Sequence, residues 1–287
     1  MTISGFSFVR NGIKFDYPFL ESIQSILPLC DDFVIAVGES DDGTLKKIQE
    51  LHSPKIKILE TTWNKELRSG GTILAQQTNI ALQQVTGDWA FYLQADEVVH
   101  EKDVPVIHDA MHRYREDQTV EGLLFEYRHF FGSYGYIGAS RRWYRREIRA
   151  FKTGLGAQSW GDAQGFRIRG RKLRVKLVEA CIHHYGWVKP PRIQQLKQQN
   201  FHKFWHPDSW VEEHVGGESE FDYSNSGKLV PFQGSHPSVM KDRVQQENWR
   251  FQYDPSKLRQ PFKERLLDAL EEKTGHRLGE YKNYEIV

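Results

Sequence analysis

The stretch Trp89-Ala90-Phe91-Tyr92-Leu93-Gln94-Ala95-Asp96-Glu97 indicates both the fold of this chain and the position of its site. Its first five residues are apolar, and a run this short is far below the roughly 20 residues that span a bilayer but typical of a buried strand. Two acids follow where that strand ends. Carboxylates there lose hydration and repel each other, so they need a cation or strong hydrogen-bond donors. A divalent ion such as Mg²⁺ or Mn²⁺ is one such partner, and a plain acidic turn before a helix is the alternative.

The residues before this stretch alternate between strand-like and helix-like patterns. Short apolar strands are predicted at residues 3–9, 32–37, 55–59 and 89–93. Apolar residues at helical spacing lie between them, as in the segment that carries Ile73, Leu74 and Ile80. Because parallel strands need a crossover, usually a helix, this alternation predicts a Rossmann-type α/β sheet flanked by helices.

Polar clusters follow three of the predicted strands, at 10–11, 39–42 and 94–97. Ligands of such sheets collect at the carboxyl ends of the strands, so we expect these clusters to meet in one site.

The second half of the chain loses the simple alternation and predicts a mixed α+β region. A helix is expected near 103–114 and a strand at 122–130. The segments 166–169 and 173–177 alternate apolar with basic residues around Gly170, which predicts a hairpin. Beyond Pro190 the chain is predicted to be mainly helical, with a Gly-rich, Ser-rich and Pro-rich loop at 216–237.

The composition limits the possible functions. The 287 residues include 39 Lys or Arg and 38 Asp or Glu, so a net charge of +1 argues against nucleic-acid binding through bulk positive charge. Two cysteines cannot form a disulfide framework, and the first residues lack the pattern of a secretion signal. A cytoplasmic location is therefore expected.

Residues 141–176 are locally basic, with twelve Lys or Arg against only Glu147 and Asp162. Arginine forks recognise phosphate, so this stretch is a candidate contact for a diphosphate or an anionic acceptor. A solvated basic face is the alternative. A third interpretation is peripheral contact with anionic lipid at the inner face of the membrane.

Several segments resemble the family 2 glycosyltransferases of the GT-A fold. They are 8–11 (FVRN), 37–44 (VGESDDGT), 78–82 (TNIAL), 86–89 (TGDW) and 91–97 (FYLQADE), in the order and spacing of that family. The resemblance implies that residues 1–100 bind a nucleotide-sugar donor and that 101–190 bind the acceptor, with 191–287 as a helical C-terminal extension. It implies an inverting transfer to a hydroxyl of a glycan or lipid-linked acceptor of the cell envelope, aided by a divalent metal, Mn or Mg.

The resemblance also assigns roles to residues. Donor contacts are implied for Val9, Arg10, Asn11, Glu39, Asp42, Thr78, Asn79, Gln94 and Ala95. Asp96 matches the metal-binding acid of an Asp-x-Asp motif, with Glu97 as an adjacent helper and His184 as a further ligand. Gln94 departs from the first Asp of that motif. Asp162 is the candidate general base, and Glu126 and Glu179 are the alternatives.

Three other classes of protein fit these residues less well. A nucleotidyltransferase needs a glycine-rich phosphate loop with a basic residue after the first strand, and Arg10-Asn11-Gly12 does not supply it. A noncatalytic glycan-binding protein would use the many aromatic residues, but Asp96 argues for a metal acid. A dinucleotide oxidoreductase is disfavoured because no G-x-G-x-x-G follows the first strand.

Overall fold

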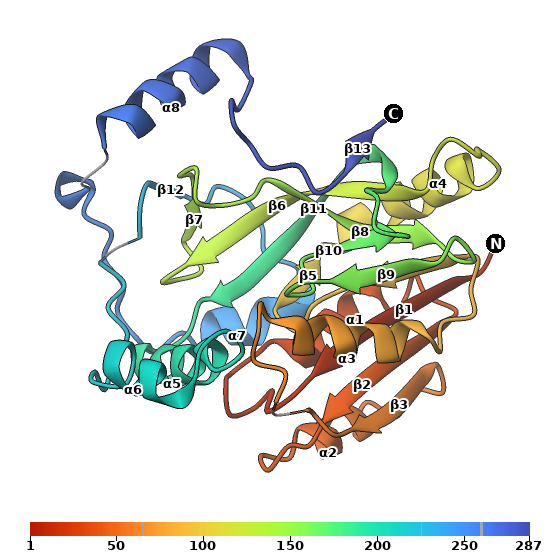
Figure 1. Cartoon of the computed structure of the whole chain (residues 1–287), viewed down its shortest axis with the longest axis horizontal. Coiled ribbons are helices and arrows are strands. Elements are labelled where there is room, and N and C mark those ends of the chain that lie inside the picture. Colours follow the sequence, from red (N-terminus) through yellow and green to blue (C-terminus); the bar gives the residue numbers. More distant parts are fainter. Residues whose placement is uncertain (65, 225, 259–260) are drawn as a thin grey trace.

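The computed structural model describes residues 1–64, 66–224, 226–258 and 261–287. Its centre is a mixed sheet flanked by helices, as predicted. Figure 1 shows the N-terminal strands, in red and orange, on one side of this sheet and the later strands, in green, on the other. Within the described residues no helix combines the length and the apolar character needed to cross a membrane.

The N-terminal side is a parallel sheet with the order β3-β2-β1-β4. Its strands are β1 (Ile3–Val9), β2 (Asp32–Gly38), β3 (Ile56–Thr61) and β4 (Trp89–Tyr92). The connecting helices are α1 (Phe19–Ile26), α2 (Thr44–Gln49) and α3 (Thr72–Leu82). Each predicted strand is confirmed to within two residues at each end, because short apolar runs between segments of helical spacing indicate parallel strands.

The later strands make the sheet mixed. β8 (Arg146–Lys152) lies antiparallel between β4 and β6 (Gly122–Phe131), and β11 (Arg174–Trp187) runs parallel to β6. The short strand β5 (Glu97–Val99) begins directly after the turn that follows β4 and pairs with β11. The turn at Asp96 is therefore held between two strands of the sheet.

The remaining elements complete the edges. They are η1 (Glu101–Asp103), α4 (Val104–Tyr114), β7 (Tyr136–Gly138), β9 (Ala157–Trp160), β10 (Gly165–Ile168), β12 (Leu229–Pro231), η2 (Ser238–Met240), α7 (Lys241–Gln245), η3 (Pro255–Lys257), α8 (Phe262–Thr274) and β13 (Glu285–Ile286). The C-terminal region also holds α5 (Pro191–His202) and α6 (Asp208–His214). Its last strand, β13, returns to the sheet by pairing with β11.

The predicted hairpin around Gly170 is wrong. β10 pairs with β9, whereas β11 pairs with β6, and the two halves of the expected hairpin share only an isolated bridge between Ile168 and Arg171. The reason is burial. Val175 and Ile182 of β11 are fully buried beside β6, and a local two-stranded ribbon would leave such side chains in water.

Candidate active site

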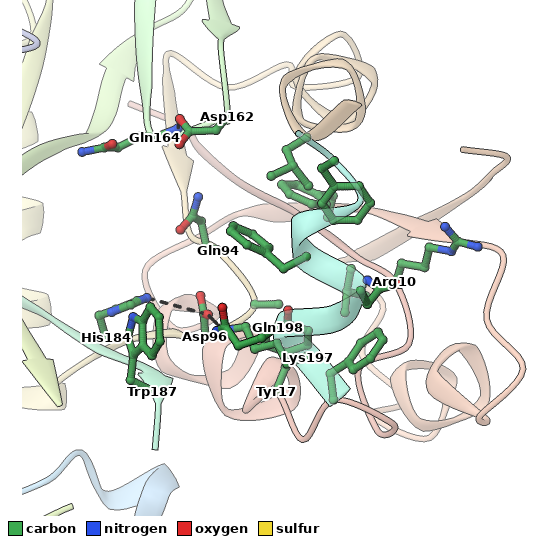
Figure 2. Close-up of a pocket in the computed structure, with 18 of the residues that line it drawn as sticks. Arg10, Tyr17, Gln94, Asp96, Asp162, Gln164, His184, Trp187, Lys197 and Gln198 are labelled. Atoms are coloured by element: carbon green, nitrogen blue, oxygen red, sulfur yellow. Dashed lines mark hydrogen bonds and ion pairs between the residues drawn. The ribbon is translucent and has the colours of Figure 1, made fainter. Parts of the chain in front are cut away.

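A cavity of about 250 Å³ lies where β1 and β4 end, at the carboxyl edge of the parallel strands. Figure 2 shows Asp162 and Gln164 at one end of it, Asp96, His184 and Lys197 at the other, and Gln94 between them. The cavity therefore has two polar ends. Its lining also includes aromatic and aliphatic side chains from several elements: Phe8, Phe15, Tyr17, Trp63, Leu74, Tyr144, Trp187, Phe201 and Phe204.

Asp96 lies in the turn between β4 and β5 and is 9% exposed. Its Oδ2 atom is 3.4 Å from Lys197 Nζ and 3.7 Å from His184 Nε2. Burial alone would raise the pKa of Asp96, but the neighbouring basic groups, above all Lys197, outweigh it and hold the pKa at about 2. Asp96 is therefore an ionised carboxylate with a protein cation beside it.

Lys197 reaches the site from α5. Its ammonium group donates to the carbonyl oxygen of Gly186 at 2.8 Å and to Asp96 Oδ2, and it lies 5.0 Å from the centre of the Tyr17 ring. The ammonium group of Lys189 lies 4.8 Å from the centre of the same ring and donates to the carbonyl of Asp16 at 2.6 Å. Burial, followed by repulsion from Lys197, lowers the pKa of Lys189 to about 7.

His184 is fixed from behind by a second imidazole. Its Nδ1 atom is 3.0 Å from Nδ1 of His129, and Nε2 of His129 is 2.8 Å from the carbonyl oxygen of Tyr144. Burial lowers the pKa of both histidines. The pair therefore directs Nε2 of His184 toward Asp96 as a neutral ring.

Glu97, next to Asp96 in sequence, does not face the cavity. Arg149 donates two hydrogen bonds to its carboxylate, at 2.7 and 2.8 Å, and both side chains are 0% exposed. The Tyr127 hydroxyl and the backbone N–H of Gln94 also donate to it, at 2.9 and 3.0 Å. Every oxygen of Glu97 is thus used within the protein interior, which leaves none for a metal ion.

The residues at this end do not fit the divalent ion that the resemblance implies. Hard cations such as Mg²⁺ and Mn²⁺ take several oxygen ligands. Here Asp96 is the one carboxylate of the turn that faces the cavity, and its Oδ2 atom already lies 3.4 Å from the ammonium group of Lys197, so an ion bound there would be placed beside a buried positive charge. Among the described residues no group of three His, Cys, Asp or Glu side chains is arranged to hold a metal.

Asp162 lies in the turn between β9 and β10, and its Oδ1 atom accepts the backbone N–H of Gln164 at 3.4 Å. It lines the cavity, whereas neither Glu126 nor Glu179 does. Glu126 is exposed and pairs with Arg146 at 3.0 Å, and Glu179 is exposed on β11. Of the three candidate bases, only Asp162 can reach a ligand in this cavity.

The predicted donor contacts divide into two groups. Val9, Arg10, Gln94 and Ala95 line the cavity, and the Arg10 guanidinium lies 5.3 Å from the centre of the Trp63 ring. The others are engaged elsewhere and do not line it: Asn11, Glu39, Asp42, Thr78 and Asn79. Figure 2 shows Arg10 extending from the end of β1.

Local contacts explain why these five residues are absent from the cavity. Asp42 accepts the N–H groups of Lys14 and Thr44, which fixes the start of α2. Thr78 is buried and donates to the carbonyl of Leu74, and Asn79 makes two hydrogen bonds with the backbone of Ser159 on β9. The backbone N–H of Asn11 donates to the Ser40 hydroxyl, and exposed Glu39 accepts from Thr62.

Comparison with known proteins gives a family. Residues 17–176, more than half of the chain, match the model described as glycosyl transferase family 2. The chain belongs to this family. No curated protein sequence matches it.

Among solved structures, this family 2 glycosyltransferase is similar to S. aureus TarS. The structure of TarS 1-349 has 13% sequence identity and a TM-score of 0.43, with 76% of this chain and 67% of that chain covered. The complex of TarS 1-349 with UDP-GlcNAc has 12% identity and a TM-score of 0.42, with 76% and 68% covered. The structure titled TarS has 14% identity and a TM-score of 0.40, with 76% and 41% covered.

Five of the twelve basic residues in 141–176 of this glycosyltransferase pair with acids that lie far away in sequence. Arg141 and Arg145 donate to Glu271 of α8, and Arg145 also pairs with Glu280 at 2.6 Å. Arg171 and Arg174 both pair with Glu121, and Arg149 is the buried partner of Glu97. None of these five arginines lines the cavity.

Sequence reasoning missed the contribution of α5. The helix itself was predicted, but its buried face carries Gln194, Lys197 and Gln198, while Leu196 is 36% exposed. The spacing of the three polar residues, i, i+3 and i+4, is visible in the sequence, but polar residues at helical spacing ordinarily indicate a solvated face. Only the position of α5 over the cavity gives them another meaning.

Proposed function

We propose that this glycosyltransferase moves a sugar from a nucleotide diphosphate donor to a hydroxyl group of a glycan or lipid-linked acceptor of the cell envelope, with inversion at the anomeric carbon. The observation that carries the proposal is the cavity with a cationic end at Lys197 and a free carboxylate end at Asp162. Each end matches one requirement of that reaction.

The first requirement is charge stabilisation. When the sugar leaves, the nucleotide diphosphate gains negative charge, and preorganised cations or donors aimed at that charge lower the barrier. Lys197 supplies such a cation at the end of β4. No step is assigned to a metal ion, since Asp96 and its neighbours do not fit one.

The second requirement is a base. The attacking hydroxyl must lose its proton, and in an inverting displacement it approaches the face of the sugar opposite the leaving group. The base and the diphosphate site must then lie on opposite sides of the sugar. The separation of Asp162 from Lys197 across the cavity supports Asp162 as this base.

One wall of the cavity is aromatic and suits the nucleoside of the donor. Trp63 lies between Phe8 and Phe204, with ring centres 6.0 and 5.5 Å away, and all three rings line the cavity. Flat aromatic rings bind a nucleobase by stacking. The wall lies beside Arg10, close to the end of β1 where the donor nucleotide is expected.

The test is the conservative change Asp162→Asn, which keeps the shape of the side chain but cannot accept a proton. We expect turnover of a nucleotide-sugar, measured as release of the nucleoside diphosphate, to fall by a factor on the order of 10² or more. Donor affinity, measured by calorimetry, should stay the same because Asp162 is remote from the cationic end.

The matched control is Glu126→Gln, which removes an exposed acid from the same half of the chain. It should turn over like the unmodified protein. Near-normal turnover by Asp162→Asn, or a loss explained by weaker donor binding, would show that the base lies elsewhere.

A further inference from the structure

We propose that Lys197 binds the donor diphosphate directly, in the position where a divalent ion would otherwise stand, so that donor binding by this protein needs no metal. The inference rests on the proposed function and names the group that recognises its donor.

The carboxylate of Asp96 already has a protein cation beside it. A metal-binding carboxylate presents its oxygens to the ion, but Oδ2 of Asp96 already lies 3.4 Å from the Lys197 ammonium. A divalent ion bound to that oxygen would be brought within a few ångströms of a buried positive charge, and repulsion at such distances is strong in a low-dielectric site. Glu97, the only other acid in the turn, is fully used by Arg149, Tyr127 and Gln94.

A glycine, Gly186, gives Lys197 room beside Asp96. Gly186 of β11 supplies the carbonyl that fixes the ammonium group. A Cβ atom at position 186 would come within 2.6 Å of Asp96 Oδ2 and 2.7 Å of His184 Nε2. Only glycine permits Asp96, His184 and Lys197 to converge on one point.

The ammonium group of Lys197 has one more N–H donor than the two that its protein partners use. An ammonium group has three N–H donors, and Lys197 directs two of them to Gly186 and Asp96. Lys197 lines the cavity, so the remaining donor can serve an anionic oxygen there. Burial lowers the pKa of Lys197, whereas the charge of Asp96 and its hydrogen bond to the ammonium group oppose that shift, and the diphosphate would supply a further acceptor.

The buried face of α5 around Lys197 is polar. An ion pair between Lys197 and Asp96 could serve the fold alone, but buried ion pairs contribute little net stability. The neighbouring Gln194 is 0% exposed, and neither its Oε1 nor its Nε2 atom has a hydrogen-bond partner among the described residues. Lys197 and Gln198 of this face line the cavity, whereas Gln194 lies beside them outside its lining, and a buried polar face that is incompletely bonded is unfavourable in a purely structural helix.

The experiment measures binding of UDP, GDP, CDP and dTDP, and of the corresponding nucleosides, by calorimetry in EDTA and in Mn²⁺. Four proteins are compared: the unmodified chain, Lys197→Gln, the double variant Lys197→Gln/Asp96→Asn, and Arg192→Gln. Arg192 lies on the exposed face of the same helix, so this last variant removes one positive charge from α5 without touching the cavity.

We expect the preferred diphosphate to bind the unmodified chain equally well in EDTA and in Mn²⁺. Lys197→Gln should weaken the diphosphate by tenfold or more and the nucleoside by less than threefold, and Arg192→Gln should change neither. The double variant leaves no unpaired buried charge, so it tests the idea even if the single variant does not fold. It should show the same loss.

Two results would overturn the inference while leaving the proposed function intact. One is binding of the diphosphate that requires Mn²⁺ in the unmodified chain. The other is diphosphate binding by the double variant that is as tight as in the unmodified chain. A chain that binds none of the four diphosphates in either buffer would instead remove the proposed function, and the inference with it.

Discussion

Helices α1 and α5 each bury one face against the rest of the molecule, but the two faces are opposite in character. α1 buries Phe19, Ile23 and Ile26 in the main apolar core. α5 buries Gln194, Lys197 and Gln198, of which Lys197 and Gln198 line the cavity. Apolar burial stabilises a fold, whereas burial of polar groups costs free energy unless each is bonded. The contrast teaches that α1 serves the fold and that α5 serves the site.

The sharpest way to test the α1 side of this contrast is Ile23→Ala. Ile23 is 1% exposed, so the change removes buried methyl groups and leaves a cavity. The free energy of unfolding in urea should fall by about 2–5 kcal/mol. Nucleotide affinity of the folded variant should be unchanged, and a large loss of affinity at full folding would break the division of roles. Leu20→Ala, at a partly buried position of the same helix, should cost less.

Lys189, which precedes α5, should make the free energy of unfolding depend on pH. Lys189, just before α5, has a folded pKa of about 7, lowered by burial and by Lys197, against an ordinary value of 10.5. Between these values the unfolded chain binds the proton and the folded chain does not, so this lysine makes stability rise with pH, by up to about 1.4 kcal/mol per pH unit. Lys189→Met should remove that rise in urea titrations from pH 7 to 9. Parallel curves for the two proteins would show that Lys189 stays charged in the fold.

The smallest expected effect, that of a change at Gln194, is a gain in stability, whereas Ile23→Ala causes a loss. Gln194→Leu replaces a buried amide whose polar atoms lack partners by an apolar side chain of similar size, so it should raise the free energy of unfolding by about 1–2 kcal/mol. The control Leu196→Ala, on the outer side of α5, should change stability by only about 0.5 kcal/mol. A destabilised Gln194→Leu would mean that the amide is satisfied in solution and that α5 is an ordinary packed helix.

The parallel half of the fold was predictable because its strands are short apolar runs that alternate with segments of helical spacing. The pairing of β11 was not, since the basic residues of 166–177 fit a local hairpin equally well and only the three-dimensional position of β6 decides between them. Arg141 and Arg145 were candidates for a diphosphate contact until their partners, Glu271 and Glu280, came beside them from the end of the chain.

The site was predictable where a strand end fixes it. Asp96, Gln94 and Arg10 follow β4 and β1 directly and do line the cavity. Asp96 and Glu97 look equivalent in sequence, and only Arg149, which lies on β8, separates the cavity-facing acid from the buried one. The role of Lys197 could not be predicted, because the sequence near α5 does not indicate that this helix lies over the ends of β1 and β4.

The contact between His129 and His184 determines which ring nitrogen carries a proton. A carbonyl oxygen only accepts hydrogen bonds, so the carbonyl of Tyr144 requires Nε2 of His129 to be the protonated nitrogen, and a neutral His129 then has a bare Nδ1. His184 must donate from its own Nδ1 to that atom, which leaves its Nε2 with a lone pair directed at the cavity. One tautomer is thereby imposed through two rings by a single peptide group. A hydroxyl or a water molecule entering beside Asp96 would find a hydrogen-bond acceptor at His184.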